Sequence, residues 1–99
     1  MTELRIVGGF VIDGTGAPRR RADVAIRDGR IVAVGETGSG SGAPTVDARG
    51  RVVSPGFIDI HSHSDESVLI NSALESALHQ GVTCVVAGNC GGSSAPACT

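Results

Sequence analysis

Short apolar runs separated by turn-forming residues dominate the first half of the chain. Residues 22–27 alternate apolar and polar side chains, and the pair Asp28-Gly29 leads into a second apolar run over residues 30–34. An Asp-Gly pair between two such runs is a strong signal for a β-hairpin. Similar short runs lie before and after it, so the pattern predicts that residues 1–54 form a small antiparallel β unit.

The pattern of apolar residues changes after Pro55. It predicts a strand over residues 57–60, a helix over residues 71–80 and a second strand over residues 82–87. The helical stretch has apolar residues at helical spacing, and Gly81 would end it. The second strand is nearly all apolar and rich in β-branched residues, which is typical of a strand buried on both faces of a parallel sheet. The second half is therefore predicted to be a βαβ unit.

Two histidines and a cysteine follow these two strands. His61 and His63 are separated by one residue, so in an extended chain they share a face with Cα atoms about 6.5 Å apart. Cys90 comes after the next strand, and the carboxyl ends of parallel strands meet at the same edge of a sheet. Imidazole and thiolate groups are zinc ligands. A metal site is predicted here, while the histidine pair taken alone fits a solvated strand end equally well.

Other polar residues near this pair are candidates for supporting roles. Asp59 shares the face of the histidines and would orient one of them or, as we favour, fill a structural polar position. Asn89 precedes Cys90 and is predicted to support the site or its loop. Asp65 and Glu66 are expected to be solvated. His79 is expected at the end of the helix, where a cation is favoured by the helix dipole, and is not counted as a ligand.

Composition and charge narrow the possible partners. The chain has 99 residues and a formal net charge of −2, and all 8 of its basic residues are arginine. This charge gives no reason to expect nucleic acid or an anionic membrane as a partner, and the absence of lysine removes Schiff-base lysine chemistry from this segment. No stretch fits a secretory signal or a membrane span. With an odd number of cysteines, Cys84 and Cys98 are predicted to be inert thiols. A cytoplasmic protein is the simplest expectation.

Two motifs resemble a known family. Residues 53–63, with the sequence VSPGFIDIHSH, resemble the amidohydrolase superfamily. Residues 80–91, with the sequence QGVTCVVAGNCG, are similar to its D-aminoacylase branch, the N-acyl-D-amino-acid deacylases. Residues 11–16, VIDGTG, and residues 94–96, SAP, fit the same branch, so the resemblance spans nearly the whole chain.

The resemblance implies an α/β fold, a metal-dependent (β/α)8 barrel of the TIM type preceded by a small β-sandwich. Residues 1–54 would be the β-sandwich segment and residues 55–99 the first βαβ unit of the barrel. One or two zinc ions would be bound, with His61, His63 and Cys90 matching the ligands that follow the first two barrel strands. The other histidine ligands and the aspartate that serves as catalytic base would follow later strands.

On this basis the chain is expected to be a truncated, N-terminal part of a zinc-dependent enzyme. The enzyme would hydrolyse the amide of small N-acyl-D-amino acids, and the chain alone, with no catalytic residue of its own, would be inactive. Two alternatives stay open. A cyclic-amide hydrolase of the dihydropyrimidinase type shares the first motif but gives no reason for the Gly-Asn-Cys-Gly element. A non-catalytic β module would bind no metal, which metal analysis would reveal.

Overall fold

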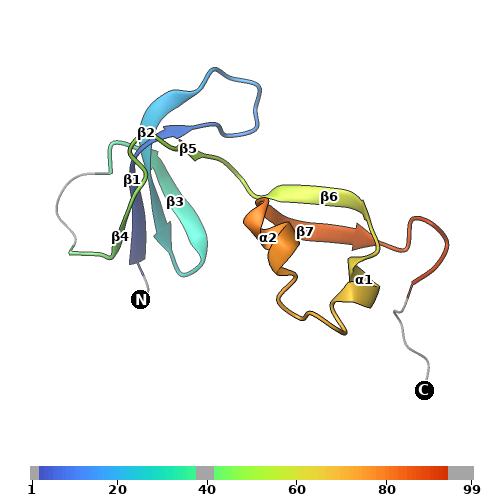
Figure 1. The fold of residues 1–99 in the computed structure, drawn as a ribbon. Helices are drawn as coiled ribbons and strands as arrows, with labels where there is room; N and C mark the ends of the chain where they lie inside the picture. Colours follow the sequence, from blue (N-terminus) through green and yellow to red (C-terminus); the bar gives the residue numbers. More distant parts are fainter. Residues whose placement is uncertain (1–2, 38–41, 94–99) are drawn as a thin grey trace. The chain divides into compact units, whose positions relative to one another are not determined.

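The computed structural model describes residues 3–37 and 42–93, and Figure 1 shows the fold. The chain divides into two compact units, Met1–Pro55 and Gly56–Thr99. The first consists of strands and turns. The second combines two strands with two short helices. The candidate metal ligands all belong to the second unit.

The first unit is a five-stranded sheet built around β1 (Glu3–Val11). β2 (Arg20–Arg27) pairs antiparallel with β1, and β3 (Arg30–Gly35) pairs antiparallel with β2. The other edge of β1 is covered by β4 (Thr45–Asp47) and β5 (Val52–Val53). The described apolar side chains that are buried are small ones, Val11, Val24, Ala25 and Ala48.

The prediction of a wholly antiparallel unit is wrong for β4 and β5, because both strands run parallel to β1. These strands are only three and two residues long. Strands this short carry no pattern that reports direction, and their connections decide it instead. The described residues of this unit form one sheet, so the second layer of a β-sandwich remains a prediction.

The Asp-Gly hairpin is confirmed. Asp28 and Gly29 have φ angles of 49° and 73°, the two positive values that a tight type I′ turn requires, and they join β2 to β3. Glycine also explains an irregularity in β1. The register with β2 shifts between Ile6 and Gly9, and Gly8 has a φ of 76°. A bulge that needs this angle suits glycine, which has no Cβ to clash.

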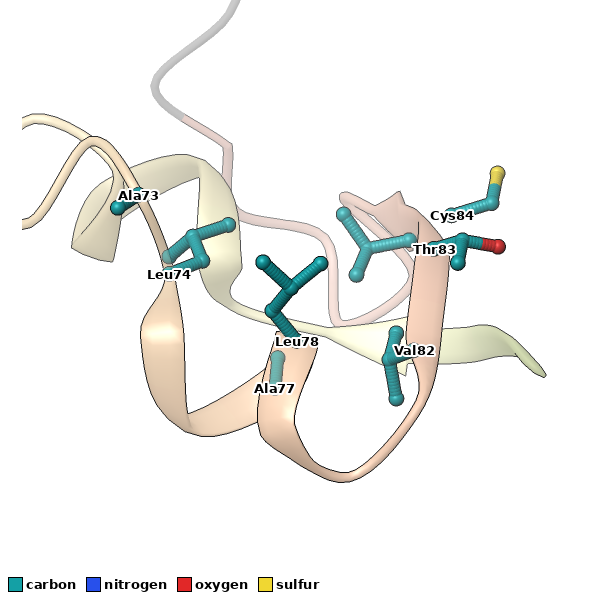
Figure 2. Close-up of a pocket in the computed structure, with 8 residues that line it drawn as sticks. Ala73, Leu74, Ala77, Leu78, Val82, Thr83 and Cys84 are labelled. Atoms are coloured by element: carbon teal, nitrogen blue, oxygen red, sulfur yellow. The ribbon is translucent and has the colours of Figure 1, made fainter. Parts of the chain in front are cut away.

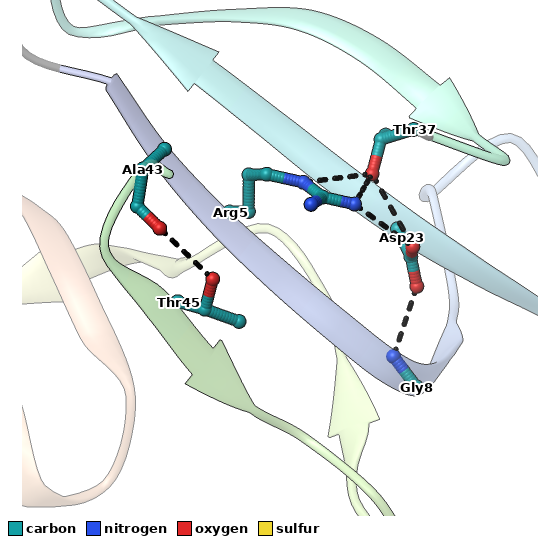
Figure 3. A network of polar contacts seen from close by, with 6 residues as sticks. All are labelled: Arg5, Gly8, Asp23, Thr37, Ala43 and Thr45. Atoms are coloured by element: carbon teal, nitrogen blue, oxygen red, sulfur yellow. Dashed lines mark hydrogen bonds and ion pairs between the residues drawn. The ribbon is translucent and has the colours of Figure 1, made fainter. Parts of the chain in front are cut away.

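A network of polar contacts ties the segment after β3 to the centre of the sheet (Figure 3). Arg5 donates from Nη2 to Thr37 Oγ1 at 2.7 Å, and the Thr37 hydroxyl donates to Asp23 Oδ2 at 3.2 Å. Asp23 Oδ1 accepts a hydrogen bond from the Gly8 amide at 2.9 Å, so the same carboxylate holds the bulge. Arg5 and Asp23 are half-buried, and their charges balance each other at 3.7 Å.

Two carboxylates near the surface, Asp13 and Asp47, hold turns by accepting hydrogen bonds from arginine. The hydroxyl of Thr15 and then the guanidinium of Arg20 donate to Asp13, and these hydrogen bonds lower the pKa of Asp13 to about 2. Arg49 donates to Asp47 in the same way and lowers the pKa of Asp47 to about 2. Because both values lie below the ordinary value of 3.8, these contacts persist at neutral pH and weaken only as the pH falls towards 2.

The second unit is a βαβ arrangement. β6 (Phe57–Ser62) and β7 (Val82–Ala87) pair in parallel, and α1 (Ser64–Ser67) and α2 (Glu75–His79) lie between them in sequence. The two parallel strands were predicted. The described residues contain two of the strands expected for a (β/α)8 barrel. The complete barrel therefore stays a prediction. Within the described residues, no helix is long and apolar enough to cross a membrane.

Two expectations about this unit are wrong. The helix predicted over residues 71–80 is confined to Glu75–His79, because Leu74 adopts a left-handed conformation with a φ of 45° that a right-handed helix cannot include. Strand β7 is not buried on both faces, since Thr83, Cys84 and Val86 are exposed. Two strands and two helices of four and five residues are too few to cover both faces of the sheet.

We predict that Gly9→Ala destabilises the first unit by about 1–3 kcal/mol, the usual cost of forcing extra volume into packed space. A Cβ at Gly9 would lie 2.7 Å from Val53 Cγ2 and 3.1 Å from Ala48 Cβ, so it would push β4 and β5 away from β1. The free energy of unfolding, measured by urea denaturation, reports the effect. In a Val53→Ala background the same substitution should cost less, and an equal cost in both backgrounds would contradict this packing.

Candidate metal centre

Strand β6 delivers both histidines to its carboxyl end. His61 is the next-to-last residue of the strand, and His63 occupies the position just before α1 without a side-chain capping hydrogen bond. Their rings are exposed, with centroids 6.3 Å apart and planes inclined at 47°. Asp59 Oδ1 accepts a hydrogen bond from the backbone N–H of His61 at 3.1 Å. Asp59 therefore contacts the strand backbone beneath the histidine.

Strand β7 delivers the cysteine through a glycine-flanked turn. The strand ends at Ala87, and the Gly91 N–H donates to the Gly88 carbonyl at 3.0 Å. Gly88 and Gly91 have φ angles of 85° and 81°, which are strained for any residue with a side chain. Asn89 and Cys90 occupy the middle of this turn. It brings Cys90 Sγ to 2.6 Å from His61 Nε2.

The structure brings the three predicted ligands together. One ligand atom each from His61, His63 and Cys90 lies within 4.8 Å of the others. This is the one such group of three or more His, Cys, Asp or Glu side chains in the described residues. His79 lies in the last turn of α2, as expected from sequence, and is not a member of the group.

The donor set fits zinc. Two imidazoles and a thiolate are among the ligands that zinc takes in tetrahedral sites, with bonds of about 2.0–2.1 Å to nitrogen and about 2.3 Å to sulfur. Two donors of one tetrahedral ion then stand about 3.5 Å apart. His61 Nε2 and Cys90 Sγ would have to separate by about 1 Å to admit an ion. Both side chains are exposed, which leaves the side chains themselves room for this movement.

Sequence reasoning missed one contact beside this cluster. Asp65 was expected to be solvated, but it is half-buried and its Oδ2 accepts a hydrogen bond from Ser93 Oγ at 2.8 Å. The partners are 28 residues apart, Asp65 in α1 and Ser93 in the loop after β7. No local pattern signals such a pairing, because it exists only once β6 and β7 are side by side.

Cys84 lies in a different environment from Cys90. An apolar groove of about 160 Å³ runs between α2 and β7 (Figure 2), and Cys84 is one of its lining residues. The groove is formed mainly by aliphatic side chains and contains none of the three candidate ligands. Its other lining residues are Ala73, Leu74, Ala77, Leu78, Val82, Thr83 and Val85. Cys84 therefore has no nitrogen or carboxylate donor with which to share an ion there.

The chain belongs to the amidohydrolase family, whose model matches residues 44–97. This match covers the histidine pair, the cysteine and both strands that carry them. The match confirms the resemblance to the amidohydrolase superfamily, which was one reason to expect a metal site.

Individual relatives place the chain near the D-aminoacylases. It is 53% identical over 95 residues to an N-acyl-D-glutamate deacylase of Alcaligenes xylosoxydans xylosoxydans, a match that covers 96% of this chain and 20% of that protein. The crystal structure of N-acyl-D-glutamate deacylase from Bordetella bronchiseptica, complexed with zinc and a phosphonate inhibitor, matches with 53% identity and a TM-score of 0.87. That match covers 95% of this chain and 20% of the other.

A D-aminoacylase structure that concerns the role of a binuclear metal centre matches equally well, with 50% identity and a TM-score of 0.87 over 94% of this chain and 20% of the other. The chain thus spans about a fifth of the length of the relatives it matches.

We predict that Gly56→Ala disrupts the pairing that assembles the metal centre. A Cβ at Gly56 would overlap the side chain of Thr83 on β7, lying 2.7 Å from the Thr83 Cβ. Zinc affinity, measured by competition with a chromophoric chelator, should fall. Adding Thr83→Gly removes the clash and should recover most of the affinity. Gly92→Ala, where a Cβ would meet nothing within 4 Å, is the control. Equal affinity in Gly56→Ala and Gly92→Ala would count against the predicted clash.

Proposed function

We propose that this chain supplies the first zinc ligands of an amidohydrolase that hydrolyses the amide bond of N-acyl-D-amino acids. The observation that carries the proposal is the cluster of His61, His63 and Cys90 at the ends of two adjacent parallel strands. Family membership supports the hydrolase chemistry, and the deacylase relatives support the substrate class.

Each residue of the cluster has a defined part in this proposal. His61 and His63 would bind zinc as neutral imidazoles, and Cys90 would bind it as a thiolate, which adds one negative charge and a soft donor. Asp59 and Asn89 would hold the backbone and the turn that carry these ligands. Bound zinc would lower the pKa of a water molecule and polarise the amide carbonyl. The general base would come from outside this cluster.

The alternative of a cyclic-amide hydrolase has less support. Its expected signature is the histidine motif alone. Three relatives that are 46% to 53% identical to this chain are instead N-acyl-D-amino-acid deacylases or a D-aminoacylase, and they match nearly the whole chain, including the turn with Cys90. A non-catalytic β module fits neither the family membership nor the convergence of three ligand atoms. The cytoplasmic location remains a prediction.

We predict that Cys90→Ala in the full-length protein abolishes tightly bound zinc and turnover of an N-acyl-D-amino acid together. Turnover should fall by more than about 100-fold, the upper end for residues that merely support a ligand. The matched control is Cys84→Ala, which removes the other described thiol from the groove and should leave the metal in place. Elemental analysis after exhaustive dialysis measures the zinc. If Cys90→Ala keeps stoichiometric zinc, the thiol is not a ligand and the proposal fails.

A chimera tests whether this chain fits a deacylase. We predict that residues 1–99, placed instead of the matching segment of the Alcaligenes N-acyl-D-glutamate deacylase, give a protein that binds zinc and hydrolyses N-acyl-D-glutamate. The same chimera with His61→Ala should lose turnover, because the ligand comes from the inserted segment. A folded chimera that binds no zinc would contradict the proposed role of the cluster.

A further inference from the structure

The turn that carries Cys90 is attached to the β6–α1 segment on both sides of the cysteine. On one side, Asn89 donates from Nδ2 to the main-chain carbonyl of Ile60. On the other side, Ser93 donates from Oγ to Asp65. Both hydrogen bonds join the turn to residues nearly 30 positions earlier in sequence, Ile60 in β6 and Asp65 in α1. The cysteine is thus the centre of a segment that is held at two points.

The contact of Asn89 falls where the strand pairing is irregular. The register between β6 and β7 shifts between Asp59 and Ser62, so Ile60 and His61 lie in a break in the regular ladder. In a regular parallel pair, a backbone N–H of the neighbouring strand would bond a carbonyl at this level. Here the side-chain amide of Asn89 bonds the Ile60 carbonyl. The contact therefore joins the two strands immediately before His61.

The turn that carries Cys90 needs a contact to fix its direction, because the glycine at its start leaves the backbone conformationally free. Gly88 lies between the end of β7 and Asn89 and adopts a positive φ. One backbone hydrogen bond, from Gly91 to Gly88, closes the turn but does not fix its direction relative to β6. The side chain of Asn89 supplies that direction. Because Cys90 is the next residue, the same contact determines where its thiol lies relative to His61.

The chemistry of the side chain suits this task. An amide has two donor hydrogens and no charge, so it binds a carbonyl without adding a second negative charge beside a thiolate. An aspartate has the same shape but, when ionised, has no hydrogen to donate.

We propose that Asn89 is a positioning residue that holds the Cys90 thiol against His61 before the metal arrives, and that it slows release of the bound ion. This inference rests on one part of the proposed function, the binding of a metal by the cluster. Preorganised ligands lose less conformational freedom on binding, so removal of the anchor weakens binding without removing any ligand. Residues that orient metal ligands typically contribute 10–100-fold to metal affinity.

The test uses the full-length protein loaded with zinc or with cobalt. Asn89→Ala and the isosteric Asn89→Asp both remove the donor, and the expected result is release of zinc to a chelator about 10–100-fold faster than from the unaltered protein. In the cobalt form, the thiolate-to-cobalt absorption should weaken in both variants, since fewer molecules have the thiol in place. Loss of a merely structural hydrogen bond would not change this absorption.

Gln80→Ala is the matched control. Gln80 also donates from an exposed side-chain amide to a main-chain carbonyl, that of Ser76 at 3.0 Å, within the same unit and away from the cluster. This variant should match the unaltered protein in both zinc release and cobalt absorption. If the Asn89 variants also match it, the inference about Asn89 is wrong while the metal site stands. If the unaltered protein shows no thiolate-to-cobalt absorption, both the inference and the proposed function are wrong.

Discussion

The parallel pairing of β6 with β7 is the constraint on which the candidate site depends. Parallel strands present their carboxyl ends at one edge of a sheet, and each of these strands carries candidate metal ligands at or just beyond that end. His61 and Cys90 are 29 residues apart in sequence, yet their side chains touch. An antiparallel pairing would place the histidines and the cysteine at opposite ends of the sheet. The parallel direction in which β6 and β7 pair, more than any single side chain, brings the three candidate ligands together.

The same pairing leaves the second unit with little internal support. Phe57, Ile58 and Ile60 of β6 are 59%, 64% and 69% exposed, and no residue of this unit is fully buried among those described. Its few specific restraints are correspondingly important, namely the close approach of Thr83 to Gly56, which leaves no room for a Cβ, and the two hydrogen bonds that flank Cys90. The first unit differs because its core residues Val11 and Val24 are 5% exposed and a half-buried polar network crosses its sheet.

The sequence predicted those structural features that neighbouring residues determine by themselves. Asp28-Gly29 predicted a hairpin because the turn needs two positive φ angles, and the spacing of His61 and His63 predicted a shared face because strands have a period of two. The parallel direction of β4 and β5 could not be predicted, since it depends on a connection and not on the residues of these short strands. The late start of α2 at Glu75 depends on the left-handed conformation of Leu74, which leucine rarely adopts. The partnership of Asp65 with Ser93 exists only in the folded chain.

X-ray absorption at the zinc edge tests the central claim most directly, because it reports the atoms bound to the metal. We expect the zinc-loaded, full-length protein to show a sulfur shell at about 2.3 Å together with nitrogen or oxygen ligands at about 2.0–2.1 Å, with a contribution of imidazole to the outer scattering. The sulfur shell should be absent from the Cys90→Ala variant and present in Cys84→Ala. A zinc site with only nitrogen and oxygen ligands in the unaltered protein would contradict the account.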